Sequence, residues 1–211
     1  MLMYMFSRVV TLTGGPRKVM PWVADITAYV NAQGTLPTSC WQATFGYPLG
    51  TVAWSTIAES QAALAAAMGS LGAQSDFLDR LDAGTELVAA PGQDSLREIV
   101  YGTPSDPPPI GAVATVTTAT ALVDRMADAM TWAVQIGQYV ENAIGSPVAV
   151  LRDVFGTMGG ITWIGSVPDV AAADAAAGKM AADSGYVGKL AGSKDLFIPG
   201  SGRTGQLIRI A

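Results

Sequence analysis

The sequence contains the same pattern twice, and this internal duplication constrains the fold more than any other feature. Residues recur at matching positions of the two halves: Trp22 and Trp132, Ile26 and Ile136, Tyr29 and Tyr139, Phe45 and Phe155, Trp54 and Trp163, Leu87 and Leu196. The repeating unit is about 110 residues long, well beyond the roughly 20 to 50 residues of solenoid or propeller repeats. Each copy is therefore a whole domain.

A proline-rich segment separates the two copies. Residues 105–109 read Ser-Asp-Pro-Pro-Pro, and three successive prolines lack backbone N–H donors and favour an extended chain. We predict a first repeat at residues 1–104, a linker at 105–109 and a second repeat at 110–211.

The composition predicts self-association and argues against nucleic acid as a partner. Half of the residues are hydrophobic and only 14% are charged, so part of the apolar surface should be covered by a further subunit. We expect a homo-oligomer. The 12 basic residues are outnumbered by 17 acidic ones and form no long basic run, so the sequence offers no footprint for a phosphate backbone.

The chain shows no sign of a membrane span or an export signal. Its apolar stretches are too short to cross a bilayer, and residues 1–12 alternate like a strand rather than like a signal peptide. The single cysteine, Cys40, cannot form an internal disulfide, which suits a reducing compartment. We predict a cytoplasmic protein in which Cys40 is a small buried hydrophobe rather than a reactive nucleophile.

Hydrophobic periodicity and turn residues predict the same element order in both halves. In the first half we expect a strand at 4–13, a helix that includes Trp22 and ends at Gly34, a hairpin of 38–45 and 51–55, and a final strand at 96–101. Thr56 and Glu59 resemble a capping box that opens a helix to about Leu71, and a shorter helical piece follows at 76–81. In the second half we expect strands at 110–118, 148–155, 161–164 and 206–210, with helices at 121–144 and 169–182.

This β-α-β-β-α-β order is that of the ferredoxin-like split βαβ unit. In such a unit both helices cover one face of a four-stranded antiparallel sheet, and the other face is left bare. Two tethered copies can bury their bare faces against each other. We therefore predict an α+β fold of two tandem ferredoxin-like repeats packed sheet to sheet.

Together with the short helical pieces 75–81 and 184–190, this order resembles a tandem member of the dimeric α+β barrel superfamily. That superfamily includes the EthD-like, NIPSNAP-like and antibiotic-biosynthesis-monooxygenase-like families. The resemblance implies a pseudo-dimeric α+β barrel. Members include cofactor-free monooxygenases, haem-degrading enzymes, isomerases and proteins without known activity, so the resemblance does not choose a reaction.

The absence of histidine excludes several classes of site. Serine-histidine triads, histidine-bound metals and histidine-ligated haem all require a residue that this sequence lacks. One cysteine is too few for a thiolate zinc site or an iron-sulfur cluster. Nothing beyond aromatic richness supports a bound flavin or haem, and we predict no cofactor and no metal.

Polar residues that differ between the halves are the candidates for a site. Asp153 stands where the first half has Ala43, and it shares its strand face with Leu151. A carboxylate on an apolar face needs a partner. Candidate partners are the strand arginines: Arg8, Arg97 and Arg209. Two interpretations stay open: a structural ion pair or solvent-facing edge strand, or a one-sided ligand site in which Asp153 acts as base or acceptor and an arginine holds an anionic oxygen.

Strand aromatics and their polar neighbours complete the candidate site. Trp54 and Trp163 are either matching core positions or walls for a flat ligand. The candidate ligand-binding residues are Arg8, Gln42, Trp54, Arg152 and Trp163, with Asp153 as candidate base. We predict an α+β barrel that binds a small apolar molecule. If the protein is an enzyme, we expect a cofactor-free monooxygenase, or an isomerase or cyclase, that acts on an enolisable substrate. The alternative is a non-enzymatic, self-assembling structural or interaction protein.

Overall fold

The two repeats have the predicted element order. The computed structural model describes residues 2–102 and 107–211. The first repeat comprises β1 (Tyr4–Thr11), α1 (Pro16–Gln33), β2 (Thr38–Phe45), β3 (Thr51–Ala58), α2 (Gln61–Gly72), α3 (Ser75–Gly84), the short 3₁₀ turn η1 (Thr85–Leu87) and β4 (Gln93–Tyr101). The second comprises β5 (Val113–Thr120), the 3₁₀ turn η2 (Val123–Arg125), α4 (Met126–Ile144), β6 (Val148–Phe155), β7 (Gly160–Val167), α5 (Val170–Ala182), α6 (Ser184–Ala191) and β8 (Arg203–Arg209).

The strands close into one barrel with the order β1-β3-β2-β8-β5-β7-β6-β4. Within each repeat the order is that of a ferredoxin-like sheet: β4-β1-β3-β2 in the first and β8-β5-β7-β6 in the second. Every neighbouring pair is antiparallel. The two repeats meet at the pairs β2–β8 and β4–β6, so the eight described strands leave no free sheet edge among themselves. The predicted α+β fold of two packed ferredoxin-like repeats is confirmed.

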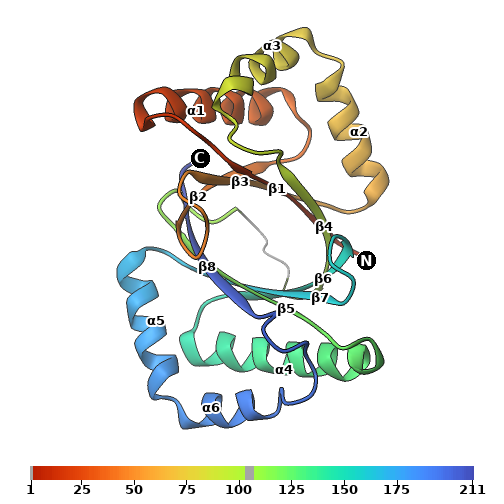
Figure 1. Cartoon of the computed structure of the whole chain (residues 1–211), viewed down its shortest axis with the longest axis vertical. Helices are drawn as coiled ribbons and strands as arrows, with labels where there is room; N and C mark the ends of the chain where they lie inside the picture. The colour runs from red at the N-terminus through yellow and green to blue at the C-terminus, as the bar shows by residue number, and fades with distance from the viewer. Residues whose placement is uncertain (1, 103–106) are drawn as a thin grey trace.

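The helices form two outer layers on opposite sides of the barrel (Figure 1). Helices α1, α2 and α3 cover the sheet of the first repeat, and α4, α5 and α6 cover that of the second. Side chains along each strand alternate between the barrel interior and the helical layer. Each repeat can therefore form a core, or a cavity, between its own sheet and its own helices.

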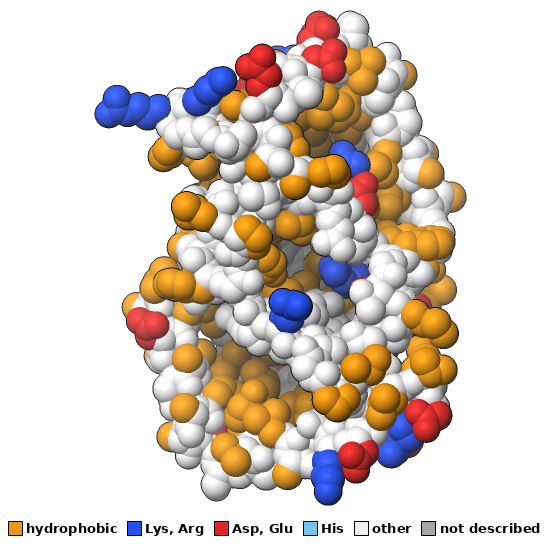
Figure 2. Space-filling model, viewed as in Figure 1, with side chains coloured by type: hydrophobic (Ala, Val, Ile, Leu, Met, Phe, Trp, Pro, Cys, Tyr) orange, Lys and Arg blue, Asp and Glu red, His pale blue; other side chains and the backbone are white. Residues whose placement is uncertain are grey.

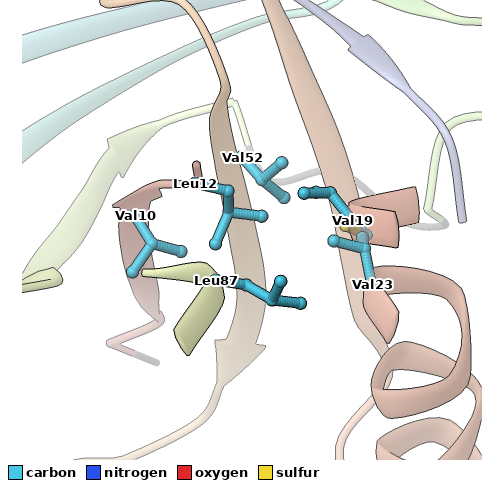
Figure 3. Close-up of a cluster of buried hydrophobic side chains, with 7 residues drawn as sticks. Val10, Leu12, Val19, Val23, Val52 and Leu87 are labelled. Atoms are coloured by element: carbon cyan, nitrogen blue, oxygen red, sulfur yellow. The ribbon is translucent and has the colours of Figure 1, made fainter. Parts of the chain in front are cut away.

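Two kinds of apolar core hold this arrangement together. Inside the barrel, Trp41, Ala53, Ala114 and Leu207 pack across the two repeats. Between sheet and helices, the first repeat packs Val10, Leu12, Val19, Val23, Cys40, Val52 and Leu87 (Figure 3). Burying a valine or leucine side chain contributes roughly 1.5 to 3 kcal/mol, so these contacts fix α1 on the sheet.

The long helices begin and end for identifiable reasons. Pro16 occupies the first turn of α1, where its missing N–H costs nothing. Gly34 ends α1 as predicted, and its N–H donates to the carbonyl oxygen of Val30 at 2.8 Å. Helix α4 starts five residues later than predicted because η2 precedes it. Asp169 caps α5 by accepting a hydrogen bond from the N–H of Ala172 at 2.8 Å.

The predicted capping box of Thr56 and Glu59 is wrong. β3 continues through Ala58, and Thr56 lies within it, with its hydroxyl bound to the carbonyl oxygen of Pro37. Ser60 is the actual cap, because its Oγ accepts from the N–H of Ala63 at 3.0 Å. The β-branched residues Thr56 and Ile57 favour the strand, which therefore continues into the capping motif as far as Ala58.

Ser105 and Asp106 of the predicted linker lie outside the described residues, so its full extent stays a prediction. On its described side, the carbonyl oxygen of Pro108 accepts a hydrogen bond from the guanidinium of Arg209. None of the helices within residues 2–102 and 107–211 combines the length and the apolar character needed to cross a membrane.

Candidate functional site

A cavity of about 720 Å³ lies between the sheet and the helices of the first repeat. Strands β1 and β3 form its floor, and helices α1, α2 and α3 form its walls. Most of the lining side chains are apolar: Val10, Ile26, Val30, Leu64, Leu71, Phe77, Leu81 and Val88. Figure 2 shows charged side chains at the top and bottom of the molecule and a few near its centre, with hydrophobic side chains between them. The interior of the cavity therefore favours an apolar guest.

Trp22 and Trp54 form an aromatic corner in this cavity. Their ring centroids are 6.1 Å apart at an interplanar angle of 83°. The Nε1 of Trp54 donates to the hydroxyl of Thr27 at 2.8 Å, and the Nε1 of Trp22 donates to the carbonyl oxygen of Arg80 at 2.8 Å. Because both indole N–H groups are already bound, the two tryptophans offer ring surface rather than hydrogen bonds.

Arg8 and Asp94 are the charged side chains that line this cavity. The Nε of Arg8 donates to Oδ1 of Asp94 at 2.8 Å, and Nη2 donates to Oδ2 at 2.7 Å. These hydrogen bonds raise the pKa of Arg8 against the opposing effect of burial. The side chains are 42% and 45% exposed, so the pair reaches from the cavity to its mouth. Nη1 of Arg8 makes no hydrogen bond within the described residues.

The structure brings together two of the predicted ligand residues, Arg8 and Trp54. Sequence reasoning missed Asp94, the partner of Arg8, because it lies before the strand predicted at residues 96–101. The sequence carried half of the signal, because the spacing that aligns Trp54 with Trp163 also aligns Arg8 with Thr117. The other half comes from the strand pairing in the structure. Arg8 and Asp94 pair on adjacent strands, and the matching pair in the second repeat is Thr117 and Thr204. Both charges are thus missing from the second copy.

Asp153 lies outside this cavity and outside a second, smaller cavity between the sheet and the helices of the second repeat. Its Oδ1 accepts from Nε of Arg97 at 2.8 Å, and its Oδ2 accepts from the N–H of Thr157 at 3.0 Å. The side chain is 9% exposed and shares the interior face of the barrel with Leu151. Of the three arginines considered as partners, Arg97 makes the ion pair. This geometry matches the structural interpretation, and the role of Asp153 as a base stays a prediction.

Arg152 and Gln42 also lie outside both cavities. Arg152 pairs with Glu98 across β4 and β6, and its Nη2 lies 2.6 Å from Oε2. Gln42 is exposed and faces Ile208 at the matching position between β2 and β8. The structure therefore separates these two residues from Arg8 and Trp54.

Trp163 belongs to a second, smaller cavity of about 280 Å³ between the sheet and helices of the second repeat. Its ring lies 6.0 Å from that of Trp132 at an angle of 83°, which reproduces the corner of the first repeat. The Nε1 of Trp163 donates to the carbonyl oxygen of Ala133 at 2.9 Å. Both repeats thus keep the same aromatic frame around cavities of different size.

Cys40 is completely buried beneath α1, as predicted for a small core residue. Burial raises the pKa of its thiol to about 11, against a smaller lowering by a hydrogen bond with Thr27. At neutral pH the sulfur is therefore a protonated thiol out of reach of solvent. Among the residues described, no group of three or more acidic or cysteine side chains is arranged to hold a metal ion.

No protein-family model and no curated protein matches the sequence of this chain. Solved structures match its shape over nearly the whole length. A proposed monooxygenase of Fusobacterium nucleatum subsp. nucleatum ATCC 25586 has a TM-score of 0.74 at 9% identity, with 100% of this chain and 93% of that chain covered. An anthrone oxidase-like protein has a TM-score of 0.67 at 13% identity, with 99% and 92% covered.

A third similar structure is a proposed monooxygenase of Lactobacillus acidophilus NCFM. Its TM-score is 0.62 at 11% identity, with 99% of this chain and 94% of that chain covered. At such low identities the likeness concerns the fold. The chain therefore has the same fold as these proteins, and one polypeptide supplies both halves of its barrel.

Proposed function

We propose that the cavity of the first repeat binds one small, flat, mostly apolar molecule that carries an oxygen able to hold negative charge. The observation that carries this proposal is the ion pair of Arg8 and Asp94 in a cavity otherwise lined mainly by apolar side chains and by Trp22 and Trp54. Its volume of about 720 Å³ lies within the range of roughly 300 to 1,000 Å³ for small-molecule sites.

The two ends of the site would recognise different parts of the ligand. The faces of Trp22 and Trp54 can pack against a ring system, while Nη1 of Arg8 can donate to a phenolate or enolate oxygen. A hydrogen bond to a charged group contributes roughly 1.5 to 3 kcal/mol. Arg8 would therefore select ligands with an acidic or enolisable oxygen.

As an enzyme, such a site would support oxidation without a cofactor. The Asp94 carboxylate would accept a proton from a CH₂ group that is conjugated with a carbonyl, directly or through an aromatic ring, and Arg8 would stabilise the resulting enolate. Molecular oxygen would then oxidise the CH₂ group to a carbonyl, with one oxygen atom retained and the other released as water. Two proteins of the same fold, a proposed monooxygenase and an anthrone oxidase-like protein, support this class of reaction. Return of the proton to another carbon would instead give isomerisation.

The test uses 1,8-dihydroxyanthrone, a flat three-ring molecule with an enolisable CH₂ group. Binding without oxygen is followed by quenching of tryptophan fluorescence. Reaction in air is followed by oxygen uptake and appearance of the anthraquinone above the rate of the same solution without protein, because anthrones also oxidise slowly on their own. We expect binding, one O₂ consumed per product, and affinity at least tenfold lower in Arg8→Thr with Asp94→Thr. This double variant installs the Thr117 and Thr204 pair that the second repeat already accommodates.

A matched control removes a different ion pair from the same barrel. Glu98→Ile with Arg152→Gln installs the Ile208 and Gln42 pair found at the matching position. We expect this variant to bind and oxidise the anthrone like the natural protein. Absence of quenching, or equal loss of affinity in both double variants, would refute the proposed site. If the protein binds the anthrone but does not oxidise it, the ligand site stands and the proposed oxygenase activity is refuted.

The alternative function is self-assembly, and exposed hydrophobic residues at the two hairpin tips favour it. Phe45 and Leu49 flank the turn between β2 and β3, while Phe155 and Met158 flank the turn between β6 and β7. All four are at least 63% exposed. Native mass spectrometry of freshly purified protein tests this alternative, because a single protomer at micromolar concentration would contradict it.

A further inference from the structure

Val88 and Phe197 occupy matching positions in the two repeats. Val88 forms an isolated β-bridge with Leu12, and Phe197 forms the corresponding bridge with Ala121. Each side chain therefore approaches the tryptophan corner of its own repeat from the same direction. The position carries a small side chain in one half and a large aromatic one in the other.

Phe197 packs into the tryptophan corner of the second repeat. Its ring centroid lies 5.6 Å from that of Trp132 and 6.0 Å from that of Trp163, at angles of 69° and 64°. These are edge-to-face contacts of the kind that aromatic rings prefer. In the first repeat, Val88 leaves this space open and lines the larger cavity. A protein side chain thus occupies in one half the place that is free in the other.

A second replacement acts in the same direction. Gly34, which lines the first cavity, corresponds to Ile144, which lines the second. Replacements between α2 and α5 act the other way, because Leu64 corresponds to the smaller Ala173. The second cavity is nevertheless the smaller one, at about 280 Å³ against about 720 Å³. Side-chain size on α5 therefore cannot explain the difference, whereas Phe197 and Ile144 can.

The polar ends of the two cavities differ as well. Where the first repeat has the ion pair of Arg8 and Asp94, the hydroxyls of Thr117 and Thr204 lie 3.1 Å apart. The second repeat has thus lost both the space and the charge.

We infer that the chain has a single ligand site, in the first repeat, and that Phe197 acts as a permanent internal occupant of the second. A valine at position 88 leaves room for an aromatic ring in the first repeat, and a phenylalanine at the matching position 197 excludes such a ring from the second repeat. This inference deepens the proposed function, and it depends on that function only for the charged end of the natural ligand. The space itself can be tested with a neutral ring.

The test uses 2-fluoroanthracene, a neutral three-ring molecule of about the size of the anthrone. A cavity of roughly 150 Å³ already binds benzene, so a single ring would also fit the second cavity of about 280 Å³ and would not distinguish the two repeats. The indole N–H signals in NMR spectra report on each half separately, since Trp22 and Trp54 lie in one and Trp132 and Trp163 in the other. We expect 2-fluoroanthracene to shift only the signals of Trp22 and Trp54 in the natural protein. In Phe197→Val, the signals of Trp132 and Trp163 should shift too, and ¹⁹F titration should reach two molecules per chain.

The swap Val88→Phe with Phe197→Val keeps the composition constant and should move binding to the second repeat, with at least fivefold weaker binding in the first. Phe197→Ala serves as a second variant if the swap fails to fold, because it only removes atoms. The inference is overturned if the natural protein binds two molecules, if no indole signal shifts, or if removal of Phe197 leaves one site. Loss of anthrone binding in Arg8→Thr with Asp94→Thr concerns the proposed function alone, because binding of the neutral 2-fluoroanthracene does not require Arg8.

Discussion

Arg97 and Asp153 form an ion pair inside the barrel, on the strands β4 and β6 where the two repeats meet. At the other junction, between β2 and β8, the matching positions are occupied by Leu207 and Ala43. One fold thus joins its repeats once through a mostly buried ion pair and once through an apolar contact. The stability provided by a buried ion pair can therefore be compared with that of an apolar contact at matching positions of one fold.

We predict that Asp153→Asn lowers the free energy of unfolding by about 3 kcal/mol, because it leaves the charge of Arg97 without its partner. The double variant Arg97→Leu with Asp153→Ala copies the other junction and should stay within about 1 kcal/mol of the natural protein. Urea denaturation measures both. Anthrone binding should be unchanged in the double variant. If the double variant instead lost turnover while it stayed folded, Asp153 would regain its place as candidate base.

The second prediction concerns Cys40 and alkaline pH. The pKa of this thiol rises from 9.0 to about 11 on folding, so the stability linked to its protonated form is complete below pH 9 and is lost as the pH rises towards 11. Between pH 8 and pH 10 the natural protein should lose about 1 kcal/mol more than Cys40→Ala. Denaturation at the two pH values measures the difference. Equal losses would mean that the thiol titrates alike in both states.

Alanine rather than valine is the suitable replacement for Cys40, although the second repeat has Val150 at the matching position. A methyl group of Val150 lies against Gly137, where a Cβ atom would approach it to 2.7 Å. The first repeat has Thr27 at the position of Gly137 and therefore lacks that space. The first repeat thus combines Cys40 with Thr27, whereas the second combines Val150 with Gly137, and a valine at position 40 would lack the space that Gly137 provides.

The third prediction separates the true helix cap from the apparent one. Ser60→Ala should lower the stability by about 1 kcal/mol, because it removes the acceptor for the N–H of Ala63. Glu59→Gln should change it by less than about 0.5 kcal/mol. Asp169→Ala, at the start of α5, is the positive control. Equal losses of stability in Ser60→Ala and Glu59→Gln would contradict this assignment and support the capping box of Thr56 and Glu59.

The fourth prediction tests the hairpin tips as association surfaces. Phe45→Ser with Phe155→Ser should leave the unfolding free energy within about 1 kcal/mol, because the two rings are 71% and 63% exposed. If the tips hold protomers together, the same variant should show a smaller mass in native mass spectrometry and light scattering. An unchanged assembly would place the contact elsewhere.

The element order and the barrel could be predicted from the sequence because each half supplies an independent copy of the same pattern. Helical stripes such as Trp22 to Val30 keep their spacing in both copies, and Gly34 ends the helix where predicted. Boundaries were less certain, because Thr56 and Glu59 satisfy a local capping motif while the neighbouring residues favour a strand. Local motifs and strand propensity compete, and the strand continues here.

The candidate site was less accessible from the sequence, since it depends on which strands become neighbours. Arg8 and Trp54 could be singled out as candidates, but Asp94 approaches Arg8 only through the pairing of β1 with β4. The matching strand of the second repeat follows a loop of different length, so Asp94 does not align with Thr204 under the spacing of the preceding residues. Asp153 was conspicuous for its charge, yet its partner Arg97 and its interior face explain it structurally.

The closure of the barrel through both junctions within one polypeptide has a consequence for how the halves change. In a dimer of identical subunits, every substitution appears twice, and the stability of the closed form depends on dilution. Here the closing partner is always attached, so closure of the barrel does not depend on protein concentration. Each repeat can also acquire substitutions independently of the other. Phe197 can therefore fill space in the second repeat while the first repeat keeps its cavity open.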